Sequence, residues 1–108
     1  MKIPESIRIG GVEYEIKDDQ PALNNGEYML LGEINYYENV IKLSDIAKGH
    51  QAKCITMLHE ILHGIRNHAG LTIENEEDVV EMFARGLYQV LQDNGARLFD
   101  LKVGDQNE

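Results

Sequence analysis

Five consecutive residues, His59-Glu60-Ile61-Leu62-His63, place two imidazoles and a carboxylate at a spacing suited to metal chemistry. On a helix, residues i and i+4 lie on the same face, one turn apart. Two imidazoles so placed can converge on one ion at the roughly 2.0–2.1 Å that zinc requires. Glu60 projects about 100° round the helix from His59, so it can reach a water beside the ion rather than the ion itself. We therefore predict that His59 and His63 bind Zn²⁺ and that Glu60 is the general base.

A catalytic zinc site usually has three protein ligands and one open position. The longer pattern with a third histidine is absent, because His68 follows His63 by only five residues and belongs to the same helix. We therefore expect His68 to contact a substrate rather than the ion. Tyr36, in the hairpin that precedes the helix, is a second candidate substrate contact. It could stabilise an oxyanion, and packing on the sheet is the alternative.

The third ligand is expected to be a carboxylate from a second helix. The inward face of that helix is expected to hold the apolar residues Val80, Phe83, Leu87 and Val90. Glu76 lies in line with this face, where an unpaired charge would be costly unless a metal were bound. We predict Glu76 as the ligand, with Glu77 and Glu81 as alternatives. A solvated Glu76 that stabilises the positive end of the helix is the other interpretation.

Strands are expected to fill the first half of the chain. Gly10-Gly11 suits a tight hairpin turn, and residues 37–39 would form a second turn. Residues 18–26 are rich in Pro, Asn and Gly and are expected to be a loop. The expected strands are residues 7–9, 12–16, 28–36 and 40–43.

Two helices are expected in the second half. The first covers residues 51–68 and ends at Gly70, and Cys54 belongs to its core. Its expected buried stripe is Ile55, Leu58, Leu62 and Ile65. The second helix begins near Asn75 and ends at Asn94-Gly95. The order of these elements predicts an α+β fold, with one domain over residues 1–95 and a loosely ordered tail over residues 96–108.

The charge balance narrows the choice of partner. The chain has 19 acidic and 10 basic residues, a formal charge of −9, whereas nucleic-acid binding relies on Lys and Arg. No apolar run approaches the roughly 18 residues that span a membrane, and no signal peptide is recognised. We expect a cytoplasmic protein that binds neither nucleic acid nor a membrane.

These residues resemble the short phage and prophage proteins with an H-E-x-x-H core. Those proteins are grouped with the ImmA/IrrE-like metallopeptidases and, more broadly, with zincins of the gluzincin type. The matching segments are residues 32–36, 40–43, 57–65, 76–79 and 84–91. The resemblance implies a minimal zincin fold: a small twisted sheet, an active-site helix, and a second helix that supplies a glutamate ligand. It also implies a phage or prophage origin and a peptide or protein substrate.

Two functional hypotheses follow from the sequence. The first is a zinc-dependent hydrolase, most simply a metallopeptidase, in which Glu60 activates the attacking water. The alternative is a non-catalytic domain that zinc stabilises and that acts as an acidic protein-interaction module. Glu60 distinguishes them, because a structural site has four protein ligands and no use for a general base.

Overall fold

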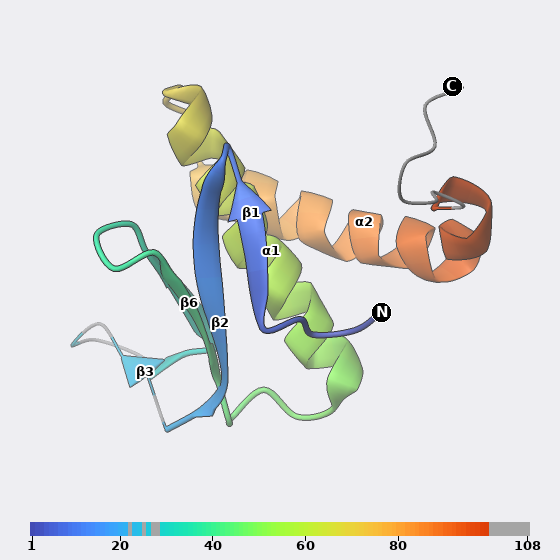
Figure 1. The fold of residues 1–108 in the computed structure, drawn as a ribbon, viewed down its shortest axis with the longest axis horizontal. Coiled ribbons are helices and arrows are strands. Elements are labelled where there is room, and N and C mark those ends of the chain that lie inside the picture. Colours follow the sequence, from blue (N-terminus) through green and yellow to red (C-terminus); the bar gives the residue numbers. More distant parts are fainter. Residues whose placement is uncertain (22, 25, 27–28, 100–108) are drawn as a thin grey trace.

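Six strands precede two helices in the computed structural model, which describes residues 1–21, 23–24, 26 and 29–99 (Figure 1). The α+β class predicted from the sequence is confirmed. The elements are β1 (Ser6–Ile9), β2 (Val12–Gln20), β3 (Leu23–Asn24), β4 (Met29–Leu30), β5 (Gly32–Asn35), β6 (Val40–Ser44), α1 (His50–Ala69) and α2 (Glu76–Leu98).

Four of the strands form a mixed sheet in the order β1-β2-β6-β5. The β1–β2 pair is antiparallel and turns at Gly10-Gly11, where both residues have the positive φ that glycine adopts without strain. β6 runs parallel to β2 and antiparallel to β5. β5 therefore lies at one edge of the sheet, while β3 and β4 form a separate pair.

Helix α1 packs between the sheet and α2 (Figure 1). The sheet side of the core contains Ile9, Tyr14, Ile16, Ile41, Leu43 and Met57. Gly64 allows close packing there, because a Cβ at this position would lie 3.0 Å from Ile9 Cδ1. A second cluster joins α1 to α2 and contains Cys54, Leu58, Ala84 and Tyr88. The placement of Cys54 in the core is thus confirmed, since its side chain is fully buried.

The loop predicted over residues 18–26 is wrong where β2 continues to Gln20 and where Leu23–Asn24 form β3, and residues 22 and 25 lie outside the described residues. Parallel pairing with β6 extends β2, with Gln20 opposite Ser44. A register shift precedes Gln20, where Asp19 has a φ of 51°. Sequence periodicity cannot detect such a partner, since β6 lies more than twenty residues away.

The strand predicted over residues 28–36 is also wrong as one element. It is broken at Leu31, because β4 pairs with β3 whereas β5 pairs with β6. Its first residue, Tyr28, lies outside the described residues. The predicted turn at residues 37–39 is confirmed and joins β5 to β6.

The buried stripe predicted for α1 is wrong at Ile65, which is 51% exposed. Because α1 contacts both the sheet and α2, its buried residues cover two faces rather than one stripe. Its predicted end at Gly70 is confirmed by a left-handed backbone conformation there.

The predicted inward face of α2 is wrong. The observed buried face is rotated about the helix axis by almost the angle between two successive residues. Its large apolar side chains are exposed: Phe83 by 55%, Val90 by 48% and Leu87 by 38%. The buried residues recur every four positions instead and are Val80, Ala84 and Tyr88. Hydrophobicity favours Phe and Leu as buried residues, but the small Ala84 side chain lets the two helices approach.

The predicted end of α2 at Asn94-Gly95 is wrong, since the helix continues to Leu98. Hydrogen bonding continues through this dipeptide, because Phe99 N–H donates to the carbonyl of Gly95. Residues 96–98 of the predicted tail are therefore helical, and residues 100–108 lie outside the described part. The predicted start is confirmed, with Asn75 preceding the first helical residue. Within the described residues, no helix is both long and apolar enough to cross a membrane.

Candidate metal centre

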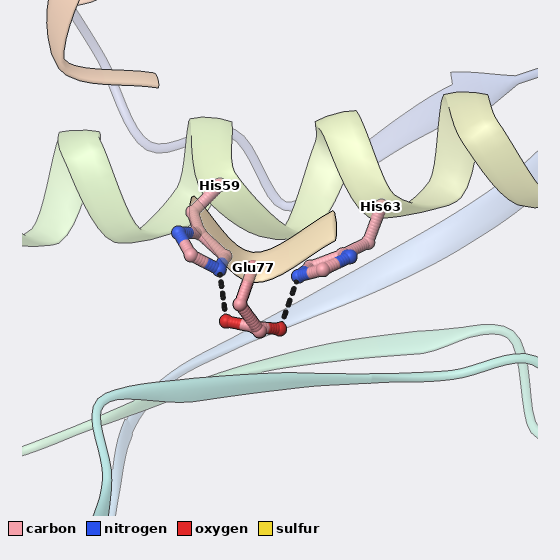
Figure 2. A group of neighbouring side chains, drawn as sticks. All are labelled: His59, His63 and Glu77. Carbon is pink, nitrogen blue, oxygen red and sulfur yellow. Dashed lines mark hydrogen bonds and ion pairs between the residues drawn. The ribbon is translucent and has the colours of Figure 1, made fainter. Parts of the chain in front are cut away.

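His59 and His63 lie one turn apart on α1 with their rings close together, as the sequence spacing predicts (Figure 2). Their ring centroids are 4.8 Å apart, and the side chains are only 16% and 12% exposed. The first turn of α2 brings acidic side chains next to both rings, because α2 packs across α1. Two partly buried imidazoles thus face a group of carboxylates.

Glu77 joins the two histidines (Figure 2). Its Oε2 lies 3.1 Å from Nε2 of His59, and its Oε1 lies 2.7 Å from Nε2 of His63. One ligand atom from each residue lies within 4.8 Å of the other two. Two imidazole nitrogens and one carboxylate oxygen form a common ligand set of catalytic zinc sites, with bonds of about 2 Å. The three residues therefore fit a divalent ion after small side-chain rotations.

The second ring nitrogen of His63 is held by Glu76, which is held in turn by Arg66. Glu76 Oε2 lies 2.6 Å from His63 Nδ1, and Glu76 Oε1 lies 2.9 Å from Arg66 Nε. The hydrogen bond from His63 lowers the pKa of Glu76, burial opposes this effect, and Arg66 adds to it. We call these residues the His63 triad. A proton donated from Nδ1 to Glu76 would leave the Nε2 lone pair of His63 available to a metal ion.

An equivalent chain of partners holds His59. Glu81 Oε1 lies 2.8 Å from His59 Nδ1, and Glu81 Oε2 accepts a hydrogen bond of 2.8 Å from Arg85 Nε. Burial raises the pKa of Glu81, but the hydrogen bonds from His59 and Arg85 outweigh it and lower the pKa overall. We call these residues the His59 triad. Both histidines thus direct Nε2 toward Glu77 and Nδ1 toward another glutamate.

Glu60 is a buried acid beside the two histidines. It is 7% exposed, and burial raises its pKa from 4.5 to about 7, although His59 and His63 oppose the shift. A carboxyl group with a pKa near the working pH can both accept and release a proton.

A cleft of about 1040 Å³ opens over these residues. It lies between α1, the start of α2 and the edge strand β5, and Glu60, His59, His63 and Glu77 all line it. Gly32 of β5 lies directly above α1, because a Cβ there would meet Thr56 Cγ2 at 2.7 Å and Glu60 Cγ at 3.4 Å. A cleft of this size could hold a short peptide segment.

The two predicted substrate contacts lie in different places. Tyr36 lines the cleft, where burial raises its pKa and Arg66 opposes the shift. His68 does not line the cleft; its Nε2 lies 3.3 Å from the hydroxyl of the buried Tyr14. A side chain at Gly10 would collide with the His68 ring, so His68 is packed against the first hairpin.

The structure favours a different carboxylate as the third metal ligand from the one predicted from the sequence. The group that could hold a metal contains Glu77, whereas Glu76 and Glu81 contact the outer nitrogens of the histidines. The ranking changed because the inward face of α2 follows Val80, Ala84 and Tyr88. Relative to the predicted face, this rotates Glu77 toward α1.

The ion pairs of Arg66 and Arg85 with glutamates were not predicted from the sequence. One signal was available for Arg85, which follows Glu81 by four residues, the spacing of an ion pair on a helix. The pair of Arg66 with Glu76 joins two helices, so only the tertiary structure reveals it. Comparison with known protein families, curated proteins and solved structures gives no match for this chain.

Proposed function

We propose that this protein is a zinc-dependent peptidase. The observation that carries the proposal is the convergence of His59 Nε2 and His63 Nε2 on Glu77, next to the buried Glu60. These three ligands would leave one position open toward the cleft, as catalytic zinc sites require. A structural zinc would need a fourth protein ligand, and the group that could hold a metal among the described residues contains three.

His59, His63 and Glu77 would hold the ion. When bound, zinc would polarise the scissile carbonyl and make water a stronger nucleophile at neutral pH. Glu60 would accept the proton of the attacking water and later donate it to the leaving amine. Without metal its pKa is about 7, and a bound cation would lower it and favour the carboxylate form that accepts a proton. Tyr36 lines the same cleft and would donate a hydrogen bond to the oxyanion.

The two triads would keep the histidines in the tautomer that binds metal. An Nδ1 proton shared with a carboxylate fixes the ring orientation and raises the basicity of Nε2. Glu76 and Glu81 supply these carboxylates, and an arginine fixes each of them. Neither glutamate would then need to contact the ion.

The edge strand β5 supports a peptide as the substrate. Its outer edge has no strand partner in the four-stranded sheet, and Gly32, Glu33 and Ile34 line the cleft. An extended peptide could add to this edge through backbone hydrogen bonds, which would place its carbonyl groups along α1. The absence of a side chain at Gly32 leaves room for Glu60 below the peptide.

The resemblance to short phage proteins of the ImmA/IrrE-like type extends the proposal. It is the reason to propose a peptide or protein substrate in the cytoplasm of a bacterial host. The chain would use its acidic surface, with a formal charge of −9, to favour basic partners over nucleic acid.

Cleavage of a mixed peptide library tests the proposal. The protein is loaded with one equivalent of zinc, and products are identified by mass spectrometry. Glu60→Gln should abolish cleavage while zinc binding persists, because the ligands remain. Glu74→Gln is the matched control, since Glu74 is exposed and outside the cleft, and it should cleave like wild type. Equal cleavage by Glu60→Gln, or none by zinc-loaded wild type, would contradict the proposal.

A further inference from the structure

The edge strand β5 presents its side chains alternately to the two faces of the sheet. Gly32 faces α1, since a Cβ there would lie 2.7 Å from Thr56 Cγ2. Ile34 also faces α1, because its Cδ1 lies 3.2 Å from the position of a Cβ at Gly64. Glu33 lies between them and therefore faces the opposite side of the sheet, with its side chain 36% exposed. The strand thus presents a partly exposed carboxylate on the face away from α1.

Glu33 has a more distant partner than the glutamates of α2 have. Its carboxylate lies 3.8 Å from Nζ of Lys42, which is opposite it in the register of β5 and β6. This distance is longer than a hydrogen bond. Glu76 and Glu81, in contrast, each contact a histidine and an arginine at 2.6–2.9 Å. The carboxylate of Glu33 can therefore still pair with a cation that approaches from the other side of β5.

A peptide bound along the free edge of β5 would place one residue beside Glu33. In the four-stranded sheet β5 has only β6 as a neighbour, and Glu33 lines the cleft. Side chains opposite each other on neighbouring strands share a face, and their Cβ atoms are about 5 Å apart. The side chain beside Glu33 would therefore point away from α1. It would reach the carboxylate without contacting the residues that could hold a metal.

We propose that this protein prefers peptides with a lysine or arginine at the position beside Glu33, an inference that rests on the function proposed above and narrows its substrate class. A cation at this position pairs with Glu33, whereas an aspartate or glutamate is repelled by it. Gly32 lies directly above Glu60, so the residue beside Glu33 lies within about two residues of the scissile bond. The net charge of −9 attracts basic peptides in general, and Glu33 selects the position of the basic residue.

Lys42 limits the size of the preference. It lies one strand further from the bound peptide than Glu33 does, which is about 10 Å from the peptide side chain at the usual spacing of strands. Salt largely screens the repulsion between two cations at this distance. Lys42 nevertheless neutralises part of the charge on Glu33. The preference for lysine over glutamate should therefore be about fivefold, as expected for cross-strand pairs of charges at a protein surface.

Peptide binding to the zinc-loaded Glu60→Gln variant tests the preference without cleavage. Short neutral peptides carry one lysine, glutamate or glutamine, and the position of this residue is moved along the peptide. Fluorescence anisotropy measures their affinities. At one position, the lysine peptide should bind about fivefold more tightly than the glutamate peptide. High salt should reduce this ratio, because Glu33 is partly exposed.

Replacement of Glu33 in the same background distinguishes a local contact from the general effect of an acidic protein. Glu33→Lys should reverse the preference at that position. Glu33→Gln adds no charge beside Lys42 and should abolish the preference. Glu74→Lys is the matched control, because it makes the same change in net charge at an exposed position outside the cleft, and it should keep the preference. Circular dichroism checks that each variant is folded.

Equal affinity for lysine and glutamate peptides at every position would overturn the inference, as would a preference that persists in both Glu33 variants. Loss of the preference in Glu74→Lys would assign it to net charge and would also overturn the inference. Cleavage by zinc-loaded wild type separates this inference from the function on which it rests. Cleavage without a preference for lysine contradicts only the role of Glu33. A preference in binding that depends on Glu33, without any cleavage, contradicts only the peptidase activity, and no binding of any peptide contradicts both.

Discussion

The two triads contain the same residue types but differ in exposure to solvent and in the contact of the arginine: Arg85 Nε donates a hydrogen bond to Glu81, whereas Arg66 Nε forms only an ion pair with Glu76. In the His63 triad, the glutamate and arginine side chains are both 24% exposed. In the His59 triad, the glutamate is 41% exposed and the arginine 64%. Water screens the charges of exposed groups, so similar distances give unequal interaction energies. Bond lengths alone therefore do not rank the partners of the two histidines; the burial of those partners must be considered as well.

Removal of either histidine should lower the affinity for zinc more than any other substitution. The loss should be similar for His59 and His63. His59→Ala and His63→Ala each delete a ligand, so zinc affinity should fall by more than the roughly 10–100-fold typical of outer partners. Elemental analysis after dialysis checks this result. His68→Ala, on the same helix but outside the cleft, should retain about one zinc per chain. Zinc retention by only one of the two ligand variants would break the predicted equivalence.

Glu60 belongs to neither triad and should dominate the pH dependence of stability without metal. Its folded-state pKa is raised from 4.5 to about 7, so the folded protein binds the proton more tightly than the unfolded chain. This contribution to stability is present below pH 4.5 and is lost as the pH rises through 7. Between pH 4.5 and 8 the loss is about 3 kcal/mol.

Glu60→Gln should remove this loss, because its side chain does not ionise. Urea unfolding in a chelator at pH 4.5 and pH 8 measures the effect. The free energy of unfolding of the variant, relative to that of wild type, should be about 3 kcal/mol higher at pH 8 than at pH 4.5. The same gain in Glu74→Gln, or none in Glu60→Gln, would show that the buried carboxyl is not the source.

Replacement of the triad glutamates should lower zinc affinity by different factors in the two triads. Glu76→Gln should weaken zinc binding toward the upper end of the range of 10–100-fold, and Glu81→Gln toward its lower end. The reason is that Glu76 is less exposed and interacts more strongly with its histidine. Competition with a chromogenic chelator measures both affinities. Equal losses would show that burial does not distinguish the triads.

Replacement of the arginines should have the smallest effect on zinc affinity. Arg85→Gln breaks an exposed pair four residues apart on one helix, which is worth about 0.3–0.5 kcal/mol, or about twofold in affinity. Arg66→Gln should cost several-fold, because its pair with Glu76 is more buried and joins two helices. Zinc titrations at low and high salt check this order. Salt should reduce the effect of Arg85→Gln more than that of Arg66→Gln.

The sequence predicts the part of the candidate metal centre that is local. The spacing of His59 and His63 places both rings on one face of α1, and Glu60 follows from the same helical geometry. The two hairpin turns are also local: Gly10-Gly11 forms the first, and residues 37–39 form the second, where Asn39 has a positive φ. These predictions hold because the interactions that produce them span few residues.

The choice of carboxylate is not local. It depends on which face of α2 meets α1, and apolar residues cover a wide arc of that helix. Phe83 and Leu87 favour one phase, whereas Ala84 and Tyr88 form the observed contact. A rotation of the buried face of α2 by about one residue is enough to make Glu77, rather than Glu76, the first candidate for the third metal ligand. The ion pair of Arg66 with Glu76 likewise joins two helices, and neither sequence segment contains a pattern that predicts it.

The central claim is that His59, His63 and Glu77 hold the metal and that Glu76 supports it from outside. Zinc content and affinity of wild type, Glu77→Gln and Glu76→Gln test this claim most directly. We predict about one zinc per chain in wild type, weaker binding in Glu76→Gln, and loss of stoichiometric zinc in Glu77→Gln. Zinc lost in Glu76→Gln but retained in Glu77→Gln, or no zinc bound by wild type, would contradict the account.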